Sequence, residues 1–272
     1  MPATGKRRAL GQHFLKDRAL AETIAEIAVS RGHQAGCQTL LEIGPGRGAI
    51  TLPLAAQLAT HGIHNFILSE RDRELARQWS ERRHEFPGMR VEEGDFLELP
   101  EEKWLSQAPL AVASNLPYSA GTAIVSRLAR HPESIPVMVL MFQAEVAARL
   151  RAMPGTKSWG SLSVWIQNYW DVQKLASVPP GAFSPPPDVD SEVVVLTPRA
   201  PRVPAALRGP EAQKWESLLK ACFAHRRKML RSGLSSSETA RNALVRSGVD
   251  GTKRAEALSW EEWNRLFAAL PG

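Results

Sequence analysis

An amide, a proline and a tyrosine stand side by side in SNLPYS, residues 114–119, directly after the apolar run PLAVA. Asn115 offers a side-chain oxygen as acceptor, and Leu116, held extended because Pro117 follows it, offers its backbone carbonyl. The exocyclic amine of a nucleobase is a poor nucleophile because its lone pair is delocalised into the ring, and two acceptors on its N–H bonds localise that pair. Tyr118 offers a face on which a base can stack. The motif therefore predicts a site that activates a base amine, and the alternative is an Asx-type turn with a packed tyrosine.

A glycine-rich turn occurs earlier in the chain, in LLEIGPGRGAIT, residues 40–51. Gly44, Gly46 and Gly48 follow an expected strand and open an expected helix, so the backbone can turn sharply and approach a ligand at the helix N-terminus. The spacing is G-x-G-x-G rather than the G-x-G-x-x-G of dinucleotide sites. Glu42 precedes the turn, and its carboxylate suits an ammonium group better than a pyrophosphate. The alternative is a tight turn without a ligand.

Two acidic residues end the next two expected strands. Glu70 lies 26 residues after Gly44, near the spacing of roughly 20 residues at which an acid binds ribose hydroxyls. Asp95 ends the third strand and is followed by the aromatic Phe96. Each acid alone is explained by a solvated strand end. Together with the glycine turn they predict a ligand crevice at the carboxyl edge of a parallel sheet.

The elements that must position these residues alternate along the chain. Expected strands cover residues 37–43, 64–69, 89–95, 109–115 and 136–142, and expected helices cover 18–32, 47–59, 73–86, 121–130 and 143–152. This alternation predicts an α/β fold with a mostly parallel sheet. Beyond Gly160 a helix at 160–170 and paired strands at 171–178 and 190–198 are expected, joined by a Pro-rich run.

A second domain is expected at the C-terminus. Four prolines between residues 198 and 210 mark a linker, and residues 211–272 have the pattern of helices throughout. The sequence thus predicts a catalytic domain over residues 1–204, which includes a basic N-terminal lid segment, and a small all-helical domain over residues 205–272.

Composition limits the classes of function. The chain has 272 residues, no apolar run long enough for a membrane span and no apolar N-terminal segment for secretion, so we expect a cytoplasmic protein with no membrane partner. The protein is also expected to be a monomer. Its two cysteines, Cys37 and Cys222, are far apart and lack the spacing of a disulfide framework or a zinc site, so no metal is expected.

The basic charge lies at the two ends of the chain. Residues 1–18 hold five Lys and Arg against one acid, and residues 208–272 hold twelve against seven. Two separated basic ends favour a polyanion, although a solvated surface explains either end by itself. The residues expected to contact phosphates of such a polyanion are Lys6, Arg7, Arg8, Arg226, Arg227 and Lys228.

The order of the motifs resembles the KsgA/RsmA family of rRNA adenine N6,N6-dimethyltransferases. The motifs are GQHFL (11–15), EIGPGRG, Glu70, GDF, SNLPY, FQAEVAARL (142–150), FSPPPDVDSEVV (183–194) and FAHRRKMLRSGL (223–234). The resemblance implies a seven-stranded Rossmann-like domain that binds S-adenosylmethionine (SAM), plus a small helical domain. It also implies transfer of methyl groups to two adjacent adenosines in the 3′-terminal hairpin of 16S small-subunit rRNA, within a pre-30S particle, and a role in small-subunit maturation.

The resemblance also implies roles for single residues. Those implied to contact SAM, or the product S-adenosylhomocysteine, are Gln12, His13, Leu15, Gly44, Gly46, Glu70, Asp95, Phe96 and Asn115. The residues implied to orient the target amine are Asn115, Leu116, Pro117 and Tyr118. This chain departs from the family pattern at His13 and Ser232, where the family often has Asn, and at Trp159, where it often has Tyr.

Other classes of protein share part of the pattern. A large-subunit rRNA dimethyltransferase of the erythromycin-resistance type has the early motifs, but SNLPY and FSPPPDVDSEVV fit it less well. A DNA adenine or protein glutamine methyltransferase more often carries Asn-Pro-Pro-Tyr, and a nicotinamide dehydrogenase has no use for SNLPY. A ribosome assembly factor or a related mitochondrial transcription factor could keep the fold without activity, and a methyl-transfer assay separates that case from the enzyme.

Overall fold

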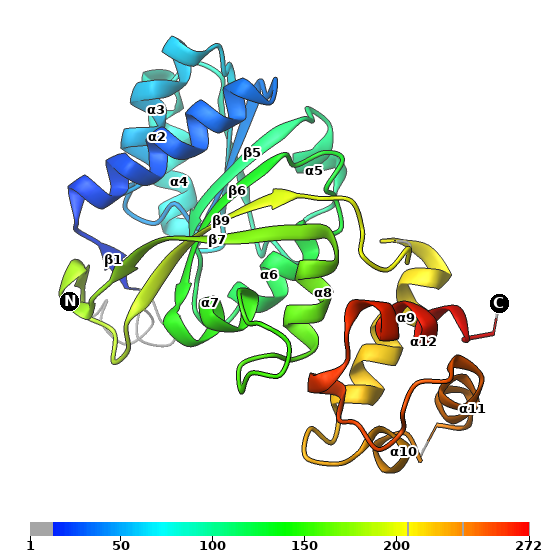
Figure 1. Ribbon diagram of the computed structural model, residues 1–272. Coiled ribbons are helices and arrows are strands. Elements are labelled where there is room, and N and C mark those ends of the chain that lie inside the picture. The colour runs from blue at the N-terminus through cyan, green and yellow to red at the C-terminus, as the bar shows by residue number, and fades with distance from the viewer. Residues whose placement is uncertain (1–12, 206, 236, 272) are drawn as a thin grey trace. The chain divides into compact units, whose positions relative to one another are not determined.

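The structure is a computed structural model that describes residues 13–205, 207–235 and 237–271 (Figure 1). The chain forms two compact units. One contains the described part of Met1–Ala147 together with Val172–Pro198, and the other contains Ala148–Asp171 and the described part of Arg199–Gly272. These units are defined by contacts and assign Ala148–Asp171 to the C-terminal helices, whereas the predicted domains divide the chain in sequence order at residue 205. The domain division stays a prediction.

A seven-stranded sheet forms the first unit's framework, with the order β4-β3-β2-β5-β6-β9-β7. Its strands are β2 (Thr39–Ile43), β3 (Asn65–Glu70), β4 (Met89–Glu93), β5 (Leu110–Asn115), β6 (Val137–Gln143), β7 (Trp170–Val178) and β9 (Ser191–Pro198). The five strands from β2 to β6 pair in parallel, and β9 pairs antiparallel with β6. The predicted seven-stranded Rossmann-like fold is confirmed.

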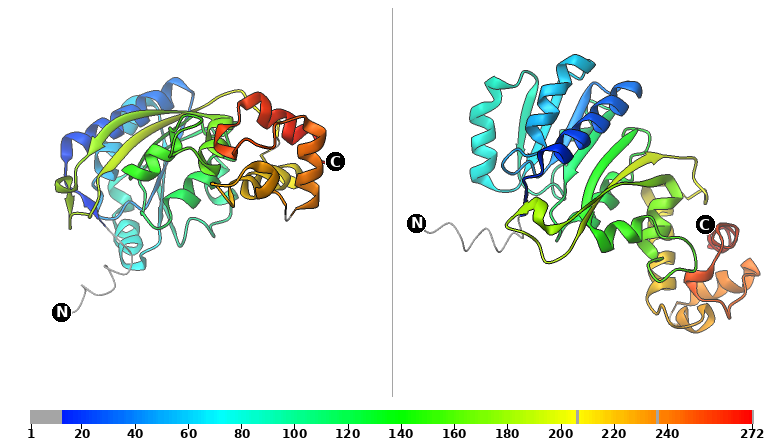
Figure 2. Two further views of the ribbon diagram at one scale, coloured as in Figure 1. Left: turned by 60° about the horizontal axis from the view of Figure 1, so that its bottom comes forward. Right: turned by 60° about the vertical axis from the view of Figure 1, so that its left-hand side comes forward.

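The central strands are apolar because both faces of the sheet are covered. All five residues of β2 are buried, as are the first six of β6. The covering helices, on both faces in Figure 2, are α2 (Arg18–Gln34), α3 (Thr51–Leu58), α4 (Arg73–Arg82), α5 (Glu102–Leu105), α6 (Gly121–Leu128) and α7 (Ala144–Leu150). The expected helix at 47–59 begins four residues later, at Thr51, because residues 47–50 form the turn that follows the glycines.

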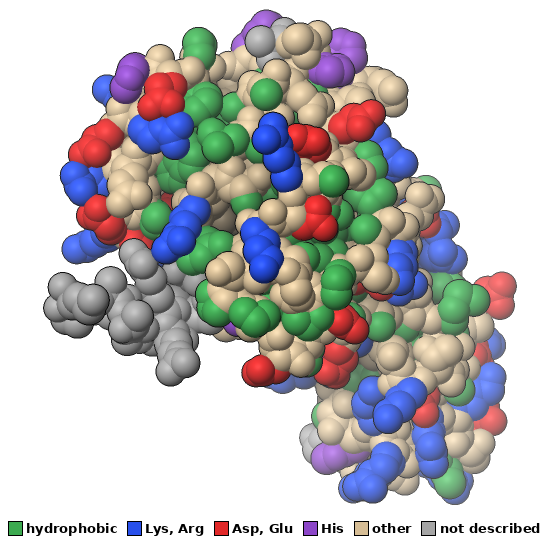
Figure 3. Space-filling view, turned by 90° about the vertical axis from the view of Figure 1, so that its left-hand side faces the viewer, with side chains coloured by type: hydrophobic (Ala, Val, Ile, Leu, Met, Phe, Trp, Pro, Cys, Tyr) green, Lys and Arg blue, Asp and Glu red, His purple; other side chains and the backbone are tan. Residues whose placement is uncertain are grey.

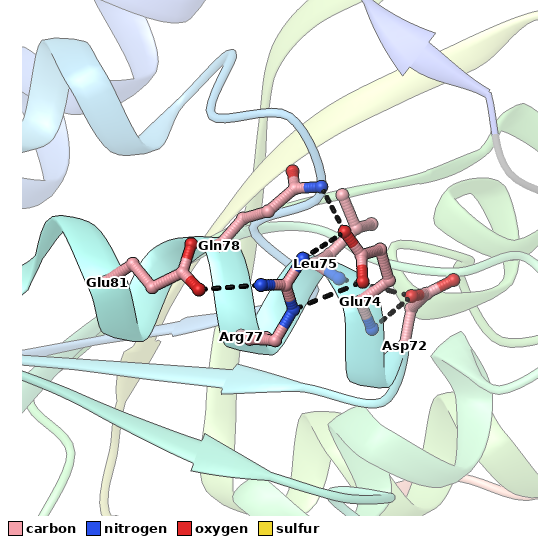
Figure 4. A network of polar contacts seen from close by, with 6 residues as sticks. All are labelled: Asp72, Glu74, Leu75, Arg77, Gln78 and Glu81. Atoms are coloured by element: carbon pink, nitrogen blue, oxygen red, sulfur yellow. Dashed lines mark hydrogen bonds and ion pairs between the residues drawn. The ribbon is translucent and has the colours of Figure 1, made fainter.

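The start of α4 is held by side chains that follow β3 directly (Figure 4). Asp72 caps the helix by accepting hydrogen bonds from the backbone N–H groups of Glu74 and Leu75, at 2.9 and 3.2 Å. Arg77 then pairs with Glu74 and Glu81, one turn before and after it, at 2.8 and 2.6 Å. The cap keeps the chain after β3 in one conformation at the edge of the sheet where Glu70 lies.

A small additional sheet ties the start of the described chain to the Pro-rich run. Strand β1 (Phe14–Leu15) pairs antiparallel with β8 (Phe183–Ser184), and the Lys16 N–H donates to the Ala182 carbonyl at 2.8 Å. The sequence analysis predicted that the Pro-rich run joins two paired strands, but it did not predict that the run also pairs with β1.

The second unit is helical around an aromatic core. Its helices are α8 (Ser161–Tyr169), α9 (Gly209–Phe223), α10 (Leu230–Gly233), α11 (Glu238–Ser247) and α12 (Trp260–Ala268). Trp215 and Trp263 are fully buried and meet edge to face at 5.9 Å. The expectation of a continuous helix through His225–Leu230 is wrong, because α9 ends at Phe223, residues 224–227 form turns and α10 begins only at Leu230. The buried Leu230 donates its N–H to the Lys253 carbonyl at 2.8 Å, a contact that a continuation of α9 to Leu230 would not allow.

No helix among the described residues has both the length and the apolar character that a bilayer crossing requires. Within the same residues, His, Cys, Asp and Glu side chains form no group of three or more that could bind a metal ion.

Candidate functional site

A cavity of about 230 Å³ lies in the first unit at the carboxyl ends of β2, β3 and β5. The predicted site residues that line it are His13, Leu15, Gly44, Gly46, Glu70, Asp95, Phe96, Asn115, Leu116, Pro117 and Tyr118. Gln12, Lys6, Arg7 and Arg8 lie outside the described residues. The structure thus brings together the three strand ends and the SNLPYS turn in one cavity, while the role of each residue stays a prediction.

The glycine turn is shaped by two aromatic side chains. Gly46 and Gly48 have φ angles of 54° and 89°, in the left-handed region that favours glycine. A Cβ atom at Gly46 would lie 3.0 Å from the Phe14 ring, and one at Gly48 would lie 2.7 Å from the Trp79 ring. The Trp79 indole N–H also donates to the Gly46 carbonyl at 2.9 Å. Both the backbone conformation and the packing therefore require glycine.

Glu70 is buried beside this turn and is held at both carboxylate oxygens. Oε2 accepts a hydrogen bond from the Gly46 N–H at 3.0 Å, and Oε1 accepts one from the Asp72 N–H at 2.8 Å. Burial raises the pKa of Glu70, and these two donors act in the opposite direction. Each oxygen can accept a further hydrogen bond, so the carboxylate is oriented to receive hydroxyl donors from a ligand in the cavity.

The SNLPYS turn fixes the orientation of its amide. Asn115 Nδ2 donates to the His13 carbonyl at 3.2 Å, and since a carbonyl only accepts, this bond identifies the nitrogen of the amide. The side-chain oxygen is thus the end of Asn115 that can accept a hydrogen bond from a ligand. Leu116 donates its N–H to the Met141 carbonyl at 3.3 Å, and the Pro117 carbonyl accepts from Gly121 at 2.9 Å. The turn is therefore anchored before and after its acceptors.

Tyr118 is held at its hydroxyl and on one face. The hydroxyl makes a 2.6 Å hydrogen bond with Ser191 Oγ, at the start of β9. The His13 ring stacks on the Tyr118 ring with centroids 5.4 Å apart and planes 30° apart. A base that stacks on Tyr118 therefore uses the other face or takes the place of the imidazole.

The Pro-rich run supplies a residue that the sequence analysis did not assign. His13 Nδ1 lies 2.9 Å from the Pro185 carbonyl, and the carbonyl only accepts, so Nδ1 is the protonated nitrogen of the ring. The run and the GQHFL motif were both recognised in the sequence, but their contact joins residues 172 positions apart and has no local signal.

Comparison with known proteins places the chain among rRNA-modifying enzymes. The family model described as ribosomal RNA adenine dimethylase matches residues 3–271. This chain belongs to the ribosomal RNA adenine dimethylase family. Ribosomal RNA small subunit methyltransferase A of Synechococcus sp. (strain JA-3-3Ab) is 39% identical over 97% of this chain and 92% of its own. The protein of the same name from Rhodospirillum rubrum is 38% identical over 97% and 88%.

Solved structures agree with this dimethylase fold. The 23S rRNA methyltransferase ErmE is 27% identical, with a TM-score of 0.64 over 94% of this chain and 99% of its own. A dimethyladenosine transferase from Plasmodium falciparum, 22% identical, has a TM-score of 0.69 over 93% and 96%. The methyl donor that the family implies is SAM. Two further features of the cavity show how its residues suit this cofactor.

The first feature is Glu42, which the sequence analysis noted but did not include among the cofactor contacts. Its side chain lines the cavity, is 2% exposed, and its Oε2 has no hydrogen-bond partner in the described part of the chain. Burial raises the pKa of Glu42 to about 8, the Thr51 side chain acts in the opposite direction, and the neighbouring Glu70 carboxylate raises the pKa further. A buried carboxyl with one oxygen unpartnered in the described part of the chain fits the ammonium group of SAM, so Glu42 would hold the methionine end of the cofactor.

The Glu42→Gln variant should flatten part of the pH dependence of stability. The folded protein holds the Glu42 proton more tightly than the unfolded chain does, so this group's contribution to stability falls as pH rises from 4.5 towards about 8. We therefore expect the difference in free energy of unfolding, variant minus parent, to increase with pH by up to about 1.4 kcal/mol per pH unit in that window. Urea unfolding between pH 5 and 8, with Glu22→Gln on the exposed face of α2 as control, measures it, and parallel profiles would contradict it.

The second feature is the support of the loop that carries Asp95 and Phe96. Asp95 accepts a hydrogen bond from the Leu97 N–H at 3.0 Å and lies 3.4 Å from Arg71. Arg127, from α6, donates to the carbonyls of Phe96 and Leu99, and its guanidinium lies 5.2 Å from the centre of the Phe96 ring. Because α6 begins directly after SNLPYS, one arginine joins the helix that follows this turn to the loop that carries Asp95.

Replacing Arg127 should therefore weaken cofactor binding more than the chemical step. We expect Arg127→Met to lose about tenfold in SAM affinity, roughly 1.4 kcal/mol, because Phe96 and Asp95 are no longer held in place. The rate at saturating SAM should change by less than about threefold. Arg73→Met is the control, since Arg73 is exposed and pairs with Glu93 on the surface. A fall in melting temperature with unchanged SAM affinity would give Arg127 a purely structural role.

Proposed function

We propose that this dimethylase transfers methyl groups from SAM to N6 of two adjacent adenosines in the 3′-terminal hairpin of small-subunit rRNA. The observation that carries the proposal is the hydrogen bond from Asn115 Nδ2 to the His13 carbonyl. Because the nitrogen of the Asn115 amide is engaged in this bond, the amide oxygen stays available to accept a hydrogen bond from a ligand in the cavity. Such an acceptor is required to orient an adenine amine. The names of the relatives that are 38–39% identical support the choice of the small subunit.

The cofactor would be held by residues of three strand ends. Glu42 would receive the ammonium group, Glu70 the ribose hydroxyls, and Asp95 with Phe96 the adenine. SAM, when bound, supplies an electrophilic methyl group on a sulfonium.

The SNLPYS turn then acts on the target base. The adenine amine donates one hydrogen bond to the Asn115 side-chain oxygen and one to the Leu116 carbonyl, and these bonds localise the lone pair of its nitrogen. Tyr118 provides a face on which the base stacks. The amine needs no base before it attacks, because its proton becomes acidic only once the nitrogen carries positive charge.

The reaction takes place, in this proposal, on a pre-30S particle in the cytoplasm, with the protein as a monomer. Methylation of large-subunit rRNA is less well supported, since the ErmE similarity is 27% against 38–39% for the small-subunit enzymes. A non-catalytic assembly factor would have no need of an oriented amide that lines this cavity.

Mass analysis of the 3′ fragment of small-subunit rRNA tests the proposal. Unmethylated small subunits are incubated with the protein and SAM, and the fragment is expected to gain four methyl groups, two on each adenosine. Large subunits, incubated in the same way, serve as the comparison substrate. No mass gain on small subunits, or a gain on large subunits alone, would overturn the proposal.

A further inference from the structure

One of the three consecutive cations in HRRKML is engaged by the protein itself. Arg226 Nη2 donates to the carbonyls of Lys157 and Trp159, each at 2.7 Å, and lies 3.3 Å from Glu256 Oε2. All four residues belong to the second unit. A guanidinium that serves two carbonyls and a carboxylate fixes the loop that carries those carbonyls. Arg226 was predicted to contact RNA, and its contacts show that it also holds the loop that carries Lys157 and Trp159.

The loop at residues 153–159 is anchored at several other points. The Gly155 N–H donates to the Glu256 carbonyl at 2.8 Å, and the Thr156 hydroxyl donates to the Met153 carbonyl at 2.7 Å. Trp159 is fully buried and meets Trp260 of α12 edge to face at 5.9 Å. The loop is therefore held in one conformation against the C-terminal helices.

The side chains that this loop and the neighbouring turn present are cationic. Lys157, Arg227 and Lys228 are exposed, and none of them makes an ion pair with another described residue. The Arg226 bond to the Lys157 carbonyl brings the loop and the turn together. Lys and Arg side chains also gather over the C-terminal helices in Figure 3. Met153, 69% exposed, adds an apolar side chain to the same loop.

Other cations of the second unit are paired with acidic side chains. Lys253 pairs with Glu262 at 2.7 Å, and Arg199 pairs with Asp171 at 3.1 Å. Uncompensated cations on a rigid loop keep their full charge for an external polyanion, because binding need not first break an internal ion pair.

We propose that residues 153–159 form an RNA-binding loop, in which Lys157 contacts a backbone phosphate beside those bound by Arg227 and Lys228. Arg226 is the positioning residue that holds the loop in place. The inference rests on the proposed function, because that function supplies the RNA partner. It adds a contact far from HRRKML in sequence and gives Arg226 a task distinct from that of its neighbours.

The salt dependence of binding to unmethylated small ribosomal subunits tests the role of Lys157. Each phosphate contact contributes about 0.9 to the slope of log affinity against log salt concentration. Lys157→Ala should therefore lower the slope by about one, and Lys157→Arg should retain it. Arg241→Ala is the matched control, since Arg241 is an exposed cation of the same unit on α11. A Lys157→Ala slope equal to that of the control and the parent would overturn the loop's role.

The pair Arg226→Lys and Arg226→Met separates positioning from phosphate contact. Lysine keeps the charge, but its flexible stem does not hold a donor in the fixed plane of the guanidinium, from which the Nη2 atom contacts two carbonyls and a carboxylate. We expect both variants to weaken particle binding and to speed amide hydrogen exchange in residues 153–159, where Gly155 is anchored. Parental binding and parental exchange in Arg226→Lys would show that Arg226 acts only as a charge.

Failure of this inference is distinct from failure of the proposed function. If the parent methylates small subunits while Lys157→Ala keeps its salt slope, the enzyme stands and the loop proposal falls. If the parent neither binds nor methylates small subunits, the proposed function falls, and the loop proposal falls with it.

Discussion

Asn115→Ala is expected to fold and to bind the ribosomal particle, yet to transfer almost no methyl groups. The side-chain oxygen is oriented by the bond from Nδ2 to the His13 carbonyl, and the alanine variant loses both. Removal of one preorganised polar contact of this kind costs on the order of 3–4 kcal/mol in the transition state, or about 100- to 1,000-fold in rate. Both methylations should suffer.

Single-turnover assays with saturating SAM measure this effect on each step separately. Unmethylated and monomethylated RNA are compared, because the monomethyl amine keeps one N–H and can occupy only one of the two acceptors. Asn65→Ala is the control: its amide nitrogen also faces a backbone carbonyl, that of Gln38, but it does not line the cavity. Rates near those of the parent in Asn115→Ala would remove the amide from the mechanism.

Glu70→Ala is expected to reduce SAM affinity by about 100-fold, or roughly 2.8 kcal/mol. The change removes an acceptor for the ribose hydroxyls and also leaves the Gly46 N–H without the partner that orients the glycine turn. Glu70→Gln should be less severe, since one amide oxygen remains. Turnover at saturating SAM should recover most of the parental rate in both variants.

Calorimetric titration with SAM and with S-adenosylhomocysteine checks this prediction. Glu74→Ala is the control, because Glu74 lies in the next helix, is exposed and pairs with Arg77 on the surface. Unfolding curves for all variants show whether the fold is retained. An affinity for SAM that is unchanged in Glu70→Ala would exclude Glu70 from the cofactor site.

The sequence predicted the sheet and the residues at its carboxyl edge because both have local signals. Apolar runs bounded by turn residues mark buried parallel strands, and a strand end places its last side chain at a known edge. Gly44, Glu70, Asp95 and Asn115 could therefore be assigned to one cavity before the structure was known, and all four line it.

Features that depend on tertiary contacts were not predicted. Arg226 and Arg227 look alike in sequence, and only the position of the carbonyls of Lys157 and Trp159 distinguishes them. The helix expected through His225–Leu230 is interrupted, because α9 ends at Phe223 and the buried Leu230 bonds to the distant Lys253 carbonyl at the start of α10. Glu42 was noted as a carboxylate, but its raised pKa arises from burial, which the residue type alone does not indicate.

The pairing of β1 with β8 bears on when the active site can form during synthesis. His13 leaves the ribosome early, whereas its partner Pro185 is 172 residues further along the chain. At a translation rate of about 5–20 residues per second, roughly 10–30 s pass between the two. During that interval the nascent protein has the glycine turn but lacks the strand that fixes His13 and, through it, the Asn115 amide. If His13 and Asn115 act as proposed, we expect methyl-transfer competence to be acquired late in translation, after most of the parallel sheet has emerged.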